Sequence, residues 1–181
     1  MHPPIALVVL GFGVCSIMAC CGRPDGLRAA LDAGHDPLTI EFNMDDPRVQ
    51  AAVREARATV GQFQKAVESS EATGAQCAFL TDFEENGVRS HVWVQADPHS
   101  VTPGKLSGSI IETPKAWHYL RAGQGVVQEP NLVTDWRIIQ HGRIDGAFTT
   151  HLLVKCMTES ERHDLERRLG VSFEGTGTGG H

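Results

Sequence analysis

Two short stretches carry side chains that could do chemistry. His91 and Trp93 stand two residues apart in the alternating stretch Val88–Ala96, and Asp135 stands next to Trp136. A histidine and an aspartate that meet across a sheet can act as general acid and general base. The same histidine beside an exposed tryptophan would instead form an amphipathic contact patch, of a kind enriched at protein interfaces. The two stretches therefore indicate either a small envelope hydrolase that uses His91 and Asp135 or a protein-binding surface.

His118 is a third candidate contact residue, between Trp117 and Tyr119. Successive helical positions point about 100° apart, so these three side chains cannot share one face of a helix. Trp117 and Leu120 are three residues apart and are the expected buried pair. This leaves His118 toward solvent, and we include it in the candidate binding surface.

Each candidate also has a purely structural interpretation. Tryptophans are highly buried on average, so Trp93 belongs to the core if the sheet is covered on both faces. Asp135 would then fix a local turn by hydrogen bonding to backbone groups. No Ser, Cys or His stands at motif distance from Asp135, so no nucleophile is indicated and we assign no catalytic residue.

Motifs for cofactors and metals are absent from the sequence. There is no G-x-S-x-G and no Walker loop, and the histidines show neither i, i+4 pairs nor an H-E-x-x-H. We expect no metal and no cofactor. With 16 basic against 22 acidic residues and a net charge of −6, the chain lacks the basic stripe of a nucleic-acid binder.

The first 21 residues contain no Asp, Glu, Lys or Arg. Their apolar run is short for a membrane span but suits a signal peptide. The run ends in Ile17-Met18-Ala19-Cys20, which resembles the lipobox of bacterial lipoproteins. We therefore expect a signal peptide over residues 1–20, lipid on Cys20, and an exported protein that is periplasmic or held at the membrane by its lipid anchor. The alternative is a buried N-terminal helix or strand.

Two cysteines, Cys77 and Cys156, lie in the part expected to fold. An oxidising compartment would permit a disulfide between them. Two unpaired thiols fit the sequence equally well, because unpaired cysteine behaves as a small hydrophobe.

After a linker over residues 21–45, periodicity predicts a single domain over residues 46–170. Asp46 can cap an amphipathic helix that starts at Pro47 and ends near Ser69. Asn86-Gly87 is a strong hairpin turn signal, and the valines of Val88–Ala96 are expected to face inward. The other predicted strands are Cys77–Leu80, Lys105–Glu112, Gly125–Gln128, Leu132–Gln140 and Ile144–Phe148.

Two further helices are predicted, and their order sets the fold class. A short inserted helix covers Lys115–Arg121, and a box-like start at Thr158 opens a C-terminal helix that runs to about Leu169. Residues 171–181 are expected to form a disordered tail. The pattern is α+β: an N-terminal amphipathic helix packed on a mainly antiparallel sheet, a short inserted helix and a C-terminal helix.

From about residue 47 to 153 the chain resembles the YegJ-like family, catalogued as domain of unknown function 2314 (DUF2314). Four pieces carry the resemblance in order: Ala51–Val60 with Phe63, His91–Val94, Gly108–Pro114, and Thr134–Trp136 followed by Gly142 and Gly146–Thr149. The family usually has an acidic residue where this chain has Ser90, so the resemblance implies no role that depends on a charge before His91. The family implies no assigned chemistry.

These observations favour a non-enzymatic binding module of the cell envelope, with a protein partner of immunity or inhibitor type. The competing classes are the small hydrolase described above and a structural or stress-related lipoprotein. We expect contact with the membrane through the lipid anchor only, and no nucleic-acid partner.

Overall fold

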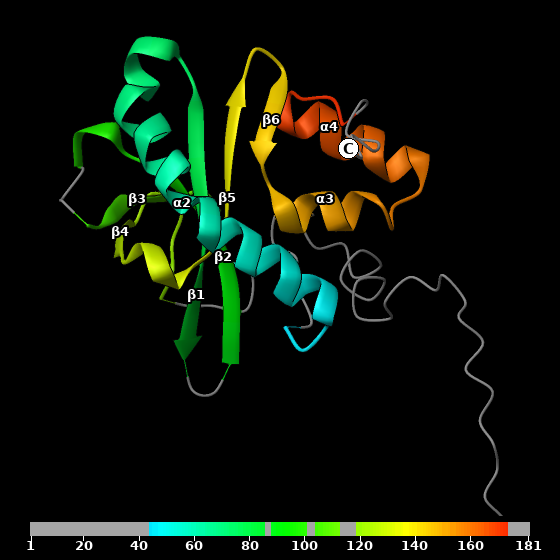
Figure 1. Ribbon diagram of the computed structural model, residues 1–181, viewed down its shortest axis with the longest axis horizontal. Helices are drawn as coiled ribbons and strands as arrows, with labels where there is room; N and C mark the ends of the chain where they lie inside the picture. The colour runs from blue at the N-terminus through cyan, green and yellow to red at the C-terminus, as the bar shows by residue number, and fades with distance from the viewer. Residues whose placement is uncertain (1–43, 86–87, 101–103, 113–118, 174–181) are drawn as a thin grey trace, which may run out of the picture.

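The fold is described by a computed structural model, which covers residues 44–85, 88–100, 104–112 and 119–173. These residues form an α+β domain of helices and one antiparallel sheet (Figure 1). Its elements, in chain order, are α2 (Pro47–Thr73), β1 (Gln76–Glu85), β2 (Val88–Ala96), η1 (Pro98–Ser100), β3 (Leu106–Ile110), β4 (Gly125–Gln128), η2 (Pro130–Leu132), β5 (Val133–Gln140), β6 (Arg143–Gly146), α3 (Phe148–Val154) and α4 (Glu159–Leu169).

Helix α2 begins where the sequence predicts. The Asp46 carboxylate accepts a hydrogen bond from the backbone N–H of Arg48, and Pro47 occupies the first helical position. The helix continues past the predicted end at Ser69 to Thr73. It ends there because Gly74, the first glycine after Ser69, readily adopts the left-handed conformation, at φ 66°. Its buried side chains form one stripe: Val49, Ala52, Val53, Ala56, Phe63, Val67 and Ser70.

The six strands lie in the order β4-β3-β2-β1-β5-β6, and each neighbouring pair is antiparallel. In the β1–β2 hairpin Asp82 lies opposite His91, and Leu80 lies opposite Trp93. Val92 and Val94 point toward α2 with Phe79, which confirms the predicted inward valines. The other side of the same strand is covered as well, since Trp93 is 7% exposed.

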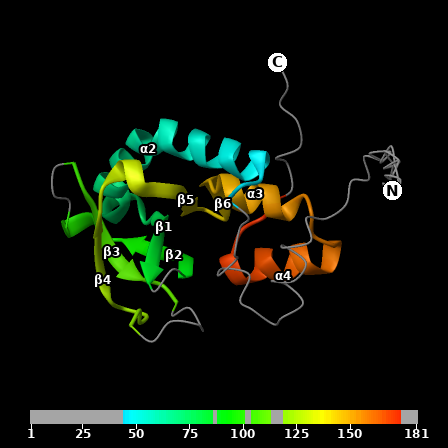
Figure 2. The same ribbon diagram turned by 90° about the horizontal axis from the view of Figure 1, so that it is seen from below.

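The sheet therefore has two buried faces. The face toward α2, here called the α2 face, carries Phe79, Val92, Val94 and Trp136. At the β5–β6 end, Ile139 and Ile144 pack against Leu165 of α4 on the opposite side. Figure 2 shows α2 and α4 on opposite sides of these strands.

Three predictions about the C-terminal half are wrong or incomplete. Tyr119, Leu120 and Arg121 are not helical, and the rest of the predicted inserted helix lies outside the described residues. The predicted strand Ile144–Phe148 ends at Gly146, and a helix that we did not predict, α3, starts at Phe148. Strand β6 stops there because Gly146 has φ 74° and its Cα lies against the Trp136 ring, where a Cβ would collide.

The predicted tail begins too early. Val171 is 7% exposed and Phe173 is 4% exposed, and both pack with Leu165. The Glu166 carboxylate accepts a hydrogen bond from the backbone N–H of Phe173, which fixes the chain after the left-handed Gly170. Two apolar side chains at alternate positions are enough to bury this segment against α4, so residues 171–173 belong to the domain.

Helix α4 has the capping box that the sequence predicts. The Thr158 hydroxyl accepts from the backbone N–H of Glu161, and the Glu161 carboxylate accepts from the backbone N–H of Thr158 at 2.7 Å. Among the described residues, no helix combines the length and the apolar character that a membrane crossing needs.

Candidate functional site

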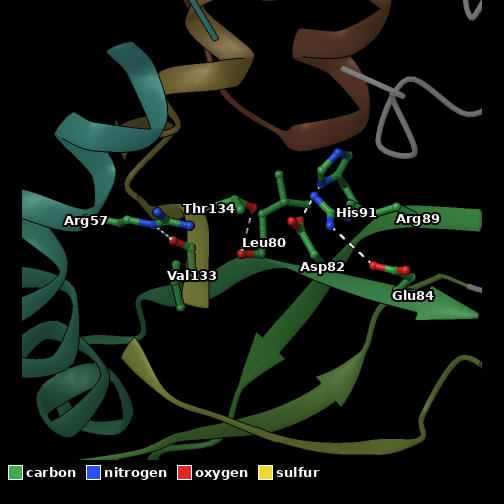
Figure 3. A network of polar contacts seen from close by, with 8 residues as sticks. All are labelled: Arg57, Leu80, Asp82, Glu84, Arg89, His91, Val133 and Thr134. Carbon is green, nitrogen blue, oxygen red and sulfur yellow. Dashed lines mark hydrogen bonds and ion pairs between the residues drawn. The ribbon is translucent and has the colours of Figure 1, made fainter. Parts of the chain in front are cut away.

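The candidate residues Asp135 and Trp136 are adjacent in β5 and face opposite sides of the sheet, and a bulge lies directly before them. The pairing of β1 with β5 shifts between Leu80 and Thr81, and Thr134 is the extra residue on β5. Its hydroxyl donates to the carbonyl oxygen of Leu80 at 3.2 Å (Figure 3). The bulge lets Val133 and Trp136, three positions apart, both face α2, although strict alternation would put them on opposite faces.

Trp136 is a core residue of the α2 face. Its indole Nε1–H donates to the backbone oxygen of Ala56 at 3.0 Å. Its ring stacks on Phe63 at 5.7 Å between centroids and meets Phe148 edge-on at 5.5 Å. All polar and apolar parts of the side chain are therefore satisfied inside the domain, and Trp136 is not part of an exposed contact surface.

The Asp135 carboxylate organises the start of α3. One oxygen accepts from the backbone N–H groups of Trp136, at 2.8 Å, and of Phe148, at 3.1 Å. The other accepts from both the backbone N–H and the hydroxyl of Thr149, at 2.8 and 2.5 Å. The residue before α3, Ala147, has no side chain that could cap the helix. Asp135 supplies that cap from a distant position in the sequence.

Burial governs the protonation of Asp135. The residue is fully buried, and this raises the pKa of its carboxyl to about 6, against the opposing effect of the hydrogen bonds from Thr149, Trp136 and Phe148. The structure thus agrees with the interpretation of Asp135 as a carboxylate that fixes local backbone. Strand β5, which carries Asp135, is an interior strand of the sheet.

On the side of the sheet opposite α2, Arg137 stacks on Trp93. We call this side the far face and define it by Leu80, Asp82, His91, Trp93 and Arg137. The guanidinium carbon lies 4.3 Å from the centre of the indole ring, and the Arg137 residue is 5% exposed. Among the residues that the structure describes, no acceptor contacts Arg137 Nη1.

The charge of Arg137 is only partly balanced. Burial lowers the pKa of its guanidinium to about 10, and the nearby negative charge of Asp135 opposes this change. Asp135 cannot also offer a hydrogen bond of good geometry, because its two oxygens already accept from four donors. Arg137 is therefore a buried cation with an aromatic partner and a nearby counter-charge, and no described residue accepts a hydrogen bond from its Nη1.

His91 meets a carboxylate that the sequence reasoning did not name. Its Nδ1 lies 2.5 Å from Oδ1 of Asp82, directly across the hairpin (Figure 3). The His91 side chain is 6% exposed and that of Asp82 is 26% exposed. Two residue pairs nearer the turn, Arg89 and Glu84 form an ion pair at 3.3 Å, in which both side chains are exposed.

The predicted contact residues thus lie in different parts of the fold. His91 and Trp93 share the far face, while Trp136 faces α2 and the Asp135 carboxylate holds α3. All four are buried, so they do not form the exposed aromatic patch that a binding surface of this kind would need. His118 and Cys20, where we expect lipid, lie outside the described residues.

Sequence reasoning missed Asp82 and Arg137. A signal for Asp82 was present, because a two-residue turn at Asn86-Gly87 places Asp82 opposite His91 by simple counting. No comparable signal exists for Arg137, whose position over Trp93 depends on the pairing of β1 with β5.

The two cysteines of the domain are free thiols in the structure. Cys77 packs in the cluster of the α2 face, and burial raises the pKa of its thiol to about 11. Cys156 packs beside Leu153 in a separate cluster. The two thiols therefore lie in separate clusters of the domain.

Within the described ranges no group of three His, Cys, Asp or Glu side chains is placed to hold a metal ion. No curated protein and no solved structure gives a significant match to the chain. One family model does match, that of an "Uncharacterized protein conserved in bacteria (DUF2314)", over residues 46–173. This range runs from the cap of α2 to the buried Phe173 and includes every far-face residue described above. The chain therefore belongs to the DUF2314 family.

Proposed function

We propose that this chain is a non-enzymatic binding module of an exported envelope protein, and that Arg137 recognises an acidic group of its partner. The observation that carries the proposal is the guanidinium on the far face. Arg137 is as buried as the core residue Trp136, yet Nη1 has no acceptor among the described residues.

A buried charged group with an unpaired donor is costly. Removing a guanidinium from water carries a penalty of several kcal/mol, which stacking on Trp93 and the charge of Asp135 offset only in part. An apolar side chain of similar size would fill the same place at lower cost. A planar guanidinium is, however, well suited to a carboxylate or phosphate group, which it can bind through two parallel hydrogen bonds.

Access to this site requires a local opening. At 5% exposure the Arg137 side chain is not on the open surface. A partner that requires such an opening associates more slowly than one that docks on a rigid surface. Recognition of this kind suits a protein with one long-lived partner, such as an immunity or inhibitor protein.

Export is the second part of the proposal. It is supported by the charge-free first 21 residues and by the lipobox-like ending at Cys20. If the proposal is right, labelled palmitate is incorporated into the wild-type chain and not into Cys20→Ser, and fractionation places the wild-type chain in the envelope. Recovery of the unlabelled, uncleaved chain from the cytoplasm would contradict export while leaving the binding proposal standing.

The binding proposal predicts opposite effects on stability and on binding for Arg137→Met. Methionine keeps an apolar stem over Trp93 and removes the buried charge, so thermal unfolding should occur at the same or a higher temperature. Purification of the full-length chain from membranes, read by quantitative mass spectrometry, should recover one dominant partner with the wild type and lose it with this variant.

A purely structural role for Arg137 would give the reverse result. The melting temperature of Arg137→Met would fall by several degrees, and the set of recovered proteins would stay the same. Failure of the wild-type chain to recover any specific partner would instead favour the structural or stress-related lipoprotein.

A hydrolase is the second candidate, and the Asp82–His91 pair is the observation that favours it. A carboxylate at 2.5 Å from Nδ1 can orient an imidazole for proton transfer. The pairing that we expected, between His91 and Asp135, is not the one present, because the Asp135 oxygens are committed to the start of α3. A hydrolase would lose activity by about 100-fold or more in His91→Gln on a panel of ester and amide substrates.

A further inference from the structure

Strand β4, Gly125–Gln128, is one end of the described sheet (Figure 1). It pairs with β3 on one side, with Ser107 opposite Val127 and Ser109 opposite Gly125. At the other end of the sheet, the chain after α4 contacts the turn that precedes β6, since the N–H of Ser172 donates to the Gly142 oxygen at 3.2 Å. The two ends of the sheet are therefore protected differently.

Hydrogen bonds next to β4 show which of its backbone groups point outward. The N–H of Ile110 donates to the Gln124 oxygen at 2.9 Å, and the N–H of Gly123 donates to the Ile110 oxygen at 2.8 Å. Antiparallel pairs alternate between bonded and non-bonded positions, so Val126 is bonded to β3, and the N–H and C=O groups of Gly125 and Val127 face away from it.

The β2–β3 pairing supports the same assignment. The N–H of Asp97 donates to the Ser107 oxygen at 2.9 Å. Ser107 and Ser109 therefore direct their backbone groups toward β2, and Gly108 directs its own toward β4. Both neighbours lead to the same conclusion, that Gly125 and Val127 direct their backbone groups out of the sheet, where no strand of the described residues pairs with them.

This edge lacks the usual protection against pairing. The sequence of β4, Gly-Val-Val-Gln, has no charge and no proline, and Val127 is 61% exposed. On the same side as Val127, small side chains leave a hollow of about 530 Å³ over the ends of β2, β3 and β4. Its lining includes Gln95, Ser107, Gly108, Ser109, Gly125 and Val127.

We propose that β4 pairs with β4 of a second copy of this chain, antiparallel and about a two-fold axis at Val126. In that register Gly125 of one copy lies opposite Val127 of the other, and each pair exchanges both backbone hydrogen bonds. Two such pairs join the sheets of the two copies edge to edge. Closed two-fold pairing of identical patches is the commonest form of homo-oligomer.

Side-chain shape favours the second copy as the occupant. In this register the Val127 side chain of each copy lies over Gly125 of the other, on the side of the sheet where the hollow is. A Cβ built on Gly125 would have nothing within 4 Å, so there is room above this residue for the incoming valine. The protruding residue and the space that receives it are both within β4.

Charge favours the same arrangement. Arg121 precedes β4 and Glu129 follows it, and both side chains are exposed. Antiparallel pairing brings the Arg121 end of each copy to the Glu129 end of the other, so opposite charges meet at both ends of the interface.

Val127→Pro is the sharpest test. Because the Val127 N–H points out of the sheet, proline there removes no hydrogen bond within the chain, but it removes a donor from each copy of the dimer. The full-length chain, in detergent with a reducing agent, is followed by sedimentation velocity from about 1 µM to about 500 µM. The wild type should form a dimer, and Val127→Pro should raise the dissociation constant about tenfold or more at an unchanged melting temperature.

Matched variants separate pairing from folding. Val127→Thr keeps the N–H and the β-branched shape and should still dimerise. Arg121→Glu and Glu129→Arg should each weaken the dimer, and the double variant should restore it. A wild-type chain that stays monomeric over this range would overturn the proposal, as would a dimer that is insensitive to Val127→Pro. A monomer that binds an added peptide of the β4 sequence would indicate an edge that accepts strands in general, which also contradicts a specific dimer.

Discussion

Trp136 and Arg137 are neighbours in β5, are almost equally buried at 4% and 5%, and face opposite sides of the sheet. Trp136 has its indole N–H bonded and its ring packed between Phe63 and Phe148. Arg137 stacks on Trp93, and its Nη1 has no acceptor among the described residues. Equal burial therefore does not mean an equal role. The Trp136 side chain is fully partnered on the α2 face, whereas Arg137 on the far face keeps one nitrogen without an acceptor among the described residues.

The comparison predicts that the largest loss of stability comes from the α2 face. Trp136→Ala removes two ring contacts and one donor to the Ala56 oxygen, which then keeps the Thr59 hydroxyl as a donor. We expect the free energy of unfolding to fall by about 3–5 kcal/mol, which many small domains do not survive. Urea denaturation measures the change, and Leu132→Ala, at a side chain that is 49% exposed, is the control. A loss for Trp136→Ala as small as that for the control would contradict the division between the faces.

Asp135→Asn is expected to have the next largest effect. Asparagine keeps the shape of the side chain, but its NH₂ group would face the N–H and hydroxyl of Thr149, which are both donors to the present carboxylate. At neutral pH we expect a loss of about 1–3 kcal/mol, concentrated in α3. Hydrogen exchange of the α3 amides locates the effect. Uniform loss of protection across the sheet, with α3 no worse, would contradict the capping role.

The same position should give a distinct pH dependence. Burial raises the pKa of Asp135 from 3.8 to about 6, so the folded state binds a proton more readily than the unfolded state between these values. The contribution of Asp135 to stability is therefore greatest below about pH 4 and declines as the pH rises through about 6, by up to about 3 kcal/mol.

To isolate this contribution, the unfolding free energy of Asp135→Asn is subtracted from that of the wild type at each pH, which cancels the other carboxyl groups. The difference should decrease with rising pH and become flat above about pH 7. A difference that increases over this range would show that hydrogen bonding outweighs burial at Asp135.

The smallest effect is expected at the Asp82–His91 pair of the far face. Asp82→Asn exchanges a charged acceptor of His91 for a neutral one and should cost about 1 kcal/mol. Glu84→Gln is a matched control two residue pairs nearer the turn, where the ion pair with Arg89 is exposed, and it should change stability by less than about 0.5 kcal/mol. Chemical denaturation of the two variants side by side tests the difference. Equal effects would mean that the buried Asp82–His91 pair contributes no more to stability than the exposed Glu84–Arg89 pair.

Local patterns were sufficient for the elements that carry their own signals. Asp46 and Pro47 determined the start of α2, alternation gave β2 its inward valines, and Thr158 with Glu161 determined the start of α4. Each of these signals lies within a few residues of the structure that it causes. The sequence therefore determined the starts of α2 and α4, the hairpin register and the α+β class.

Tertiary structure decided the rest, because the causes lie far away in the chain. Helix α3 has no cap of its own and depends on Asp135, which joins it from β5. The bulge at Thr134 places Val133 and Trp136 on one face, against the alternation that a strand pattern assumes. Arg137 stacks on Trp93 across the width of β1. Local propensity fixes where an element begins, but the partner of a buried polar group is known only when distant strands have paired.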